Sequence, residues 1–127
     1  MARFDAVTNT DFRWALAPDG TGIAILDATQ ARIHVVSLTG RPSQDVEIAG
    51  LNTPGYVSWT HDGEGLLVPR VDARAATLLS VDLQGNARVL WEQPGARDIS
   101  AMPSRDGRHL AIWVRSRSAN LWLAETP

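Results

Sequence analysis

The sequence contains no cysteine and no lysine. Without cysteine the chain can form no disulfide and offers no thiolate ligand to a metal. All 12 basic residues are arginines, against 14 acidic residues, so the formal net charge is −2. This near balance argues against nucleic acid as a partner, because general nucleic-acid binders carry a clear basic excess. Arginine also forms planar, bidentate pairs with carboxylates, which suits an interface.

Long hydrophobic runs are missing as well. No apolar stretch approaches the roughly 18 to 20 residues that a membrane helix needs, so we expect no membrane insertion. The first ten residues, MARFDAVTNT, also lack the continuous apolar stretch of a secretory signal. The composition, 44% hydrophobic and 20% charged, is typical of a globular chain, and 127 residues suit a single domain over 1–127.

An internal repeat organises the chain. The dipeptide Asp-Gly occurs three times, at intervals of 43 and 44 residues, within the similar segments ALAPDGTGIAIL, SWTHDGEGLLVP and MPSRDGRHLAIW. An aliphatic residue follows each of these aspartates by four positions. The three pairs are Asp19-Gly20, Asp62-Gly63 and Asp106-Gly107, and the three aliphatic residues are Ile23, Leu66 and Leu110.

Each hairpin is followed by further short apolar runs. These are RIHVVSL, TLLSVDL and NLWLA, and in the first two units DVEIA and ARVLWE come after another glycine-containing turn. Four short strands repeated at roughly 40 to 45 residues are the signature of a β-propeller blade. We therefore predict an all-β fold with blade units at about 12–49, 55–92 and 97–124. The second strand of each unit is apolar on successive residues, which favours a strand covered on both faces by the neighbouring blades.

The Asp-Gly pairs are interpreted as turn chemistry. A tight hairpin needs positive φ at its central positions, which glycine adopts freely and aspartate tolerates. We therefore expect Asp19, Asp62 and Asp106 to shape turns rather than to bind a metal or catalyse a reaction.

With these blocks, the chain resembles TolB-type, WD-like β-propeller repeats. The resemblance rests on APDGTGIAIL…RIHVVSLTG and WTHDGEGLLV…LLSVDLQG, and it covers nearly the whole chain as three units. Only the first unit keeps proline before the aspartate, since His61 and Arg105 replace it elsewhere. The resemblance implies a propeller fold and roles in protein interaction or as an accessory or sensor domain of a larger bacterial protein.

The third unit ends without a fourth strand, whereas a strand-like segment precedes the first unit. Its offset to the next Asp-Gly pair, 17 residues, equals that of DVEIA in the first unit. We expect this segment to complete the third blade of a second copy, so that a homodimer forms a six-bladed ring; three copies would give nine blades. The alternative is that the chain is part of a longer six- or seven-bladed domain. The predicted closing strand consists of Ala2, Arg3, Phe4, Asp5, Ala6 and Val7.

No catalytic, cofactor-binding or metal-binding residue is predicted. The three histidines, His34, His61 and His109, have no ligand-like spacing and no accompanying carboxylate pattern in the sequence. The serines include none in a Gly-x-Ser-x-Gly elbow, and DGTG and DGEG are interpreted as hairpin turns rather than phosphate-binding loops.

A candidate partner surface comes from arginine and tryptophan. Arg115 and Arg117 are expected in a loop after the second strand of the third unit, where an acidic partner could bind. Most of the five tryptophans are expected to pack between blades, but Trp91 and Trp122 fall near blade edges and could lie at a subunit seam.

Two function classes remain open. The leading one is a non-catalytic propeller module for protein–protein interaction, with itself and with a further protein as partners. The alternative is a ligand-binding or hydrolytic propeller with a site in its central channel. A third hypothesis is a gate or cap beside a peptidase domain, for which this sequence contains no catalytic counterpart.

Overall fold

A computed structural model describes residues 12–27, 30–48, 51, 56–116 and 119–125. These residues form antiparallel strands only, and none of them lies in a helix that could cross a membrane. Sheet 1 contains β1 (Phe12–Leu16), β2 (Gly22–Asp27), β3 (Arg32–Ser37) and β4 (Gln44–Glu47); sheet 2 contains β5 (Ser58–Trp59), β6 (Gly65–Val71), β7 (Ala75–Asp82) and β8 (Ala87–Pro94); sheet 3 contains β9 (Asp98–Pro103), β10 (His109–Arg115) and β11 (Ala119–Glu125).

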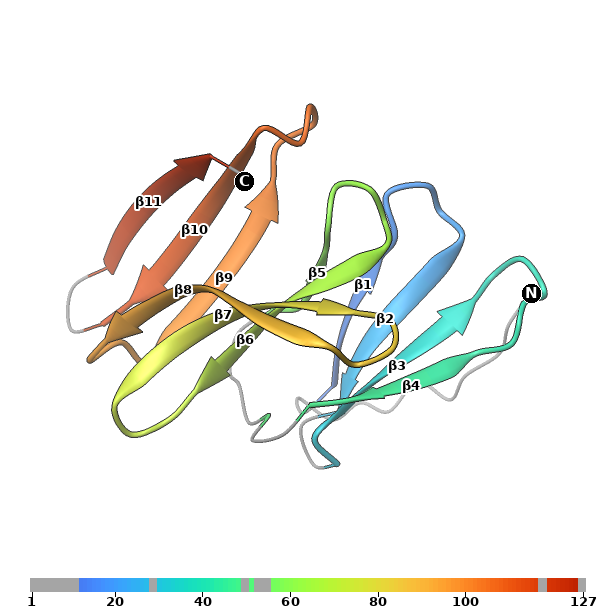
Figure 1. Cartoon of the computed structure of the whole chain (residues 1–127), viewed down its shortest axis with the longest axis horizontal. Helices are drawn as coiled ribbons and strands as arrows, with labels where there is room; N and C mark the ends of the chain where they lie inside the picture. Colours follow the sequence, from blue (N-terminus) through green and yellow to red (C-terminus); the bar gives the residue numbers. More distant parts are fainter. Residues whose placement is uncertain (1–11, 28–29, 49–50, 52–55, 117–118, 126–127) are drawn as a thin grey trace.

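Each sheet is a meander in which consecutive strands pair with one another. The order is β1-β2-β3-β4 in sheet 1 and β5-β6-β7-β8 in sheet 2, and sheet 3 contains β9, β10 and β11 among the described residues. The three sheets stand side by side, and their Asp-Gly turns lie along the same edge (Figure 1). The predicted all-β class is confirmed, and the three sheets are called blades 1, 2 and 3 below.

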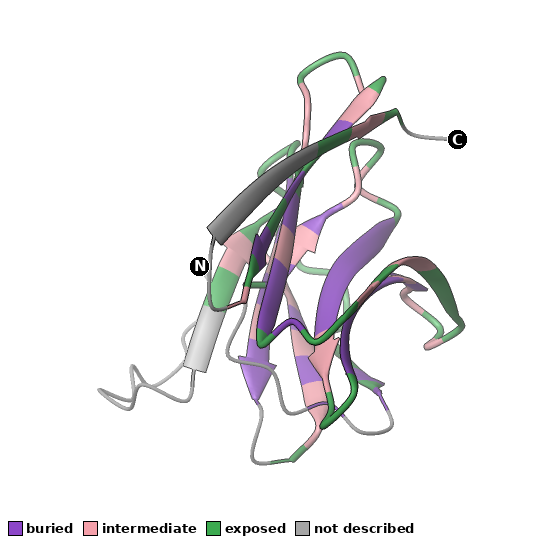
Figure 2. Cartoon of the chain, turned by 90° about the vertical axis from the view of Figure 1, so that its left-hand side faces the viewer, coloured by how far each residue is buried: buried purple, intermediate pink, exposed green. Residues whose placement is uncertain are grey.

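The core consists of two apolar clusters that lie between adjacent blades. Leu66 and Val68 of β6 pack into the cluster shared with blade 1, whereas Leu67 between them packs into the cluster shared with blade 3. β7 divides its side chains between the clusters in the same way. The buried colour is accordingly concentrated in the middle of the molecule (Figure 2). Blade 2 is thus held on both faces, and blades 1 and 3 on one face each.

This arrangement corrects the expectation that each second strand is covered on both faces. Only β6 shows an unbroken run of buried residues at its start, while β2 and β10 alternate between buried and less buried positions. The physical reason is that side chains alternate between the two faces of a strand, and blades 1 and 3 each have one neighbouring blade in this chain.

The Asp-Gly turns have the structural role expected of them, with one correction. Asp19 Oδ1 accepts hydrogen bonds from the backbone N of Thr21 at 3.0 Å and from Thr21 Oγ1 at 2.7 Å. Gly20 adopts φ +76°, but Asp19 does not adopt positive φ. Instead, Gly20 N donates to Ala17 O at 2.9 Å, which places Pro18 and Asp19 at the centre of the turn. Only the glycine therefore supplies the left-handed conformation.

Candidate interaction surfaces

The outer face of blade 1, which points away from blade 2, is largely apolar. The strand register places Trp14 opposite Ile25 and Leu16 opposite Ile23, so these four side chains share one face. Trp14 is 68% exposed and Leu16 is 53% exposed, which is unusual for side chains of this size. Val36 extends the patch because it pairs with Ile23 on β3. Contiguous exposed apolar patches occur at protein, membrane and ligand-binding sites, so this face is a candidate interaction surface.

Beside this patch lies a polar cluster centred on His34. The Nδ1 atom of His34 lies 2.6 Å from Asp45 Oδ1, and its Nε2 atom lies 3.6 Å from Oδ2 of the buried Asp27. Arg32 reaches Asp45 and Glu47, each at 3.4 Å. The hydrogen bond from His34 holds the pKa of Asp45 below its ordinary value. The cluster thus orients a histidine between two carboxylates on an otherwise apolar face.

The sequence missed this cluster, because its members are far apart along the chain and come from three strands. The hairpin register was the available signal: once β2, β3 and β4 are paired, Ile25, His34 and Asp45 fall in one row. Despite these carboxylates, the described residues contain no group of three or more His, Cys, Asp or Glu side chains suited to hold a metal ion.

The outer face of blade 3 is also apolar over much of its area. Ala111 pairs with Met102 on one side and with Leu123 on the other, and all three are exposed. Met102 is 69% exposed and Leu123 is 73% exposed. Trp113 lies two residues further along β10 on the same face. Blades 1 and 3 therefore end the stack with an exposed apolar face each.

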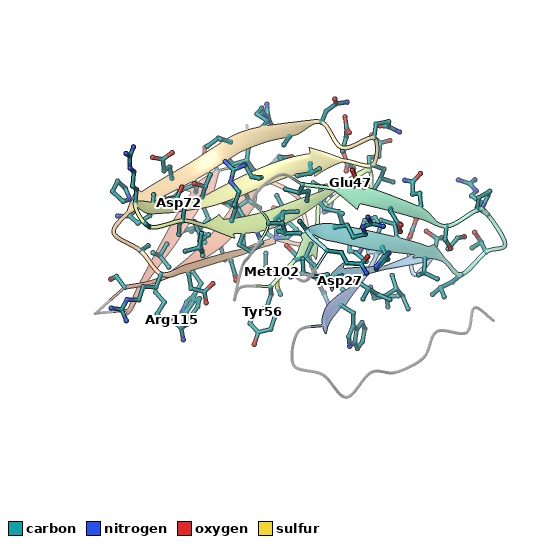
Figure 3. All side chains as sticks on the ribbon, turned by 90° about the horizontal axis from the view of Figure 1, so that it is seen from below. Asp27, Glu47, Tyr56, Asp72, Met102 and Arg115 are labelled. Carbon is teal, nitrogen blue, oxygen red and sulfur yellow. The ribbon has the colours of Figure 1, made fainter. Side chains whose placement is uncertain are left out.

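β1, β5 and β9, the first strand of each blade, border a groove of about 580 Å³. Tyr56 and Met102 lie close together along it, and Trp14 and Leu16 line the same groove from blade 1. The side view from below shows Tyr56 and Met102 projecting from the same side of the molecule (Figure 3). Two hydrogen bonds fix blade 2 against blade 3 here: Tyr56 N donates to Ser100 Oγ at 3.1 Å, and Ser58 Oγ donates to Ala101 O at 2.6 Å.

The arginines predicted as a partner surface are only partly described. Arg115 is the last residue of β10 and not part of a loop, which corrects its predicted position. It pairs with Asp98 in the strand register, and Arg115 Nη2 lies 3.9 Å from Asp98 Oδ2. The loop assignment failed because β10 continues its pairing with β9 to this residue. Arg117 lies outside the described residues, as does the predicted closing strand Ala2–Val7.

The tryptophans divide between the core and the outer faces. Trp59 is 6% exposed and donates its Nε1 hydrogen to Ala15 O at 2.9 Å, so it joins blade 2 to blade 1. Trp91, on the edge strand β8, packs against the cluster between blades 2 and 3. The backbone of Trp122 pairs with Ile112, but its side chain lies outside the described part. Trp14 and Trp113 do not pack between blades in this chain, contrary to expectation, because they lie on the outer faces.

Comparison with solved structures shows which fold these blades make. The chain superimposes on TolB from Acinetobacter baumannii with a TM-score of 0.72 at 19% identity, covering 89% of this chain and 29% of that one. A 6-phosphogluconolactonase candidate from Bacteroides uniformis gives 0.60 at 18% identity, covering 91% and 37%, and prolyl oligopeptidase B from Galerina marginata gives 0.56 at 20%, covering 89% and 20%. No family model matches the sequence, and no curated protein sequence matches it either.

The fold is therefore that of consecutive blades of a β-propeller, similar to those of TolB. The chain spans between a fifth and two-fifths of the length of these three structures. Identities near 20% carry the fold and not the activity. These structures carry different names, TolB, a lactonase and a peptidase, so function has to be argued from the surfaces of this chain.

Proposed function

We propose that this chain is a non-catalytic β-propeller segment that works by protein–protein interaction, and that its two outer blade faces bind protein. One observation carries the proposal: Trp14 and Leu16 are exposed on the outer face of blade 1 although the equivalent positions of blade 2 are buried, and the outer face of blade 3 exposes Met102 and Leu123. Leu16 and Trp59 both lie three residues before the turn aspartate, yet Leu16 is 53% exposed and Trp59 is buried against blade 1. Such a surface is stabilised when another protein surface covers it.

The predicted closing strand belongs to the same proposal. Among the described residues, β11 is the outer edge of blade 3, where blades 1 and 2 have a fourth strand. A strand added there would pair with the open edge by main-chain hydrogen bonds, which is a common mode of recognition. Residues Ala2–Val7 are proposed for this place on their offset in the sequence alone.

Hydroxyl-radical footprinting tests the proposal. The chain is labelled in the extract of cells that express it and again after purification, and labelling is followed at Trp14, Met102 and Leu123. Val89 on β8 serves as the internal reference, because it is 53% exposed although both neighbouring blades are present. Labelling of each residue is divided by its labelling in the urea-unfolded chain, and we expect this ratio in the extract to be several-fold lower at the three face residues than at Val89. Ratios at the three face residues equal to or above that of Val89 in both samples would contradict the proposed function.

The proposal that the chain is not a catalyst is tested separately. The purified chain is incubated with lactone, phosphodiester and peptide substrates, with the His34→Leu variant as a control because His34 is the histidine held between carboxylates. We expect no turnover above buffer. Turnover that His34→Leu abolishes would establish the alternative of a hydrolytic propeller.

A further inference from the structure

We infer that the outer face of blade 3 docks on the outer face of blade 1 of a second copy of this chain, so that two chains close a six-bladed ring. This deepens the proposed function and rests on it, since it names the partner of the two outer faces. The argument uses the repeat itself, because each seam inside the chain shows what the missing neighbour of each outer face must look like.

The outer face of blade 1 matches the surface that blade 2 uses to contact blade 1. In the first two strands of a blade, residues at equal distances from the turn aspartate correspond, so the four apolar residues that β1 and β2 place on the outer face have counterparts in blade 2. All four counterparts are buried in the cluster between blades 1 and 2. The corresponding pairs are Trp14 and Val57, Leu16 and Trp59, Ile23 and Leu66, and Ile25 and Val68.

The outer face of blade 3 matches the surface that blade 1 presents to blade 2. Ala111 corresponds to Ala24, and Trp113 corresponds to Leu26; both counterparts are fully buried. Leu123 pairs with Ala111 as Val35 pairs with Ala24, and Val35 is likewise buried in the cluster between blades 1 and 2. The outer face of blade 3 therefore resembles the blade 1 side of the seam between blades 1 and 2, and the outer face of blade 1 resembles the blade 2 side of that seam.

Contacts between consecutive Asp-Gly turns lead to the same inference. Pro18, in the turn of blade 1, lies near Gly63 in the turn of blade 2. A Cβ added to Gly63 would be 3.9 Å from Cδ of Pro18. His61 occupies the same position relative to Gly107, at closer range. Arg105 is the third member of this series, is exposed, and has no further Asp-Gly turn to meet among the described residues. Gly20 is the one turn glycine of the three with open space around it. A second copy would place Arg105 against Gly20.

Charge supports the same pairing. Arg115 lies at the end of the outer face of blade 3, nine residues after its turn aspartate, and more than half of its side chain is exposed. In the proposed ring this face meets the outer face of blade 1 of the second copy. That face carries Asp27, Arg32 and Glu47 in one row. Glu47, which lies 3.4 Å from Arg32 and whose side chain is 78% exposed, offers Arg115 an opposite charge there, and opposite charges across an interface favour one orientation of the partners.

The number of blades favours a second copy over other proteins. Two chains of three blades give six, which lies within the four to eight blades of known propellers. A head-to-tail contact closes into a ring when its rotation allows, and both ends of the stack are then covered at once by identical seams.

The experiment measures mass by sedimentation equilibrium for the whole chain and for single-face variants. Ile25→Arg places a charge on the outer face of blade 1, and Trp113→Arg places one on the outer face of blade 3. Val89→Arg, on the edge strand β8 of blade 2, is the matched control. Arg105→Asp, on an exposed turn, is a second blade 3 variant with little effect on folding, and circular dichroism checks every variant. We expect the wild type and Val89→Arg to have twice the chain mass of 13.8 kDa, and each face variant to associate at least tenfold more weakly.

Mixing the variants identifies the geometry. A head-to-tail contact leaves one intact seam between Ile25→Arg and Trp113→Arg, so their mixture should recover two-chain complexes that neither forms alone. A dimer built from like faces would instead leave one variant dimeric on its own, and that result would overturn the inference. A wild type that is monomeric at 100 μM would also overturn it, while protection of the faces in the cell extract would keep the proposed function. A monomer with unprotected faces would remove both.

Discussion

The imidazole of His61 lies directly against the backbone of Gly107, so closely that a Cβ added to Gly107 would come within 2.5 Å of His61 Cδ2. His61 belongs to the turn between β5 and β6, and Gly107 belongs to the turn between β9 and β10. This contact between consecutive Asp-Gly turns ties blade 2 to blade 3 at the edge where the turns lie side by side (Figure 1). It explains why a bulky residue before one aspartate is accommodated by the glycine of the next turn.

Gly107→Ala should therefore destabilise the chain more than Gly20→Ala. Both glycines have positive φ, at +73° and +76°, so each substitution costs about 1 kcal/mol of backbone strain. Only at Gly107 does the new methyl group meet a neighbour. We expect a further loss of about 1 to 2 kcal/mol there, measured by urea unfolding. The double variant His61→Ala/Gly107→Ala should regain most of that difference, and equal losses at both glycines would contradict the contact.

Trp59 should contribute more to stability than any exposed tryptophan. Trp59→Ala should cost about 3 to 5 kcal/mol, because it empties a site in the cluster between blades 1 and 2. Trp59→Phe should cost about 1 to 2 kcal/mol, since the ring is mostly replaced but the hydrogen bond to Ala15 O is lost. Val89→Ala is the control, with an expected change below about 0.5 kcal/mol. Unfolding at one fixed protein concentration measures all three, and a neutral Trp59→Ala would exclude the seam as a main source of stability.

The turn aspartates should make the chain sensitive to acid. Hydrogen bonds from Thr21, Thr60 and Ser104 hold the pKa values of Asp19, Asp62 and Asp106 below the ordinary 3.8. A carboxyl whose folded pKa is lowered stabilises the fold fully above the unfolded pKa, and this contribution is lost as pH falls through the folded value. The urea midpoint should thus be steady from pH 7 to pH 5 and fall below about pH 4.

A substitution separates these turns from the other carboxylates. The triple variant with asparagine at 19, 62 and 106 should be less stable at pH 7 and should lose less stability between pH 5 and pH 3. An unchanged acid slope in this variant would show that other groups control the transition.

His34→Leu should raise the pKa of Asp45 towards its ordinary value of 3.8. The hydrogen bond from His34 is the main cause of the lowered pKa of Asp45, and the neighbouring Arg32 contributes less. Leucine is a suitable replacement because Leu79 pairs with Val68 in blade 2 as His34 pairs with Ile25 in blade 1. Carboxyl carbon shifts followed during an acid titration measure the change. Arg32→Gln is the control and should raise the pKa of Asp45 by a smaller amount; the reverse order would contradict the geometry of the cluster.

Deletion of residues 1–7 tests the predicted closing strand. If this segment pairs with β11, its removal should increase amide exchange along β11 and weaken association of the chain, while exchange in β6 and β7 stays unchanged. These two central strands lie between neighbouring strands within blade 2 and serve as the internal control. Unchanged amide exchange in β11 would contradict the prediction that residues Ala2–Val7 pair with this strand.

Much of the architecture follows from local signals. The 43- and 44-residue spacing of three Asp-Gly pairs predicted three blades, and the apolar runs predicted where β2, β3, β6, β7 and β10 lie. Local chemistry suffices here because a turn glycine and an alternating strand are specified within a few residues. The same signals could not reveal that Arg115 still belongs to β10, since its place depends on pairing with Asp98 in another strand.

The amino-acid sequence by itself determined the repeat, the strands and the turns, because each depends on neighbours along the chain. The tertiary structure alone decided which apolar side chains are covered. Leu67 and Trp113 are both apolar strand residues, yet Leu67 is buried and Trp113 is on an outer face. That difference depends on whether a blade stands on the facing side, which no local pattern encodes. The His34 cluster has the same origin, because three strands had to be placed in register before Asp27 and Asp45 met one histidine.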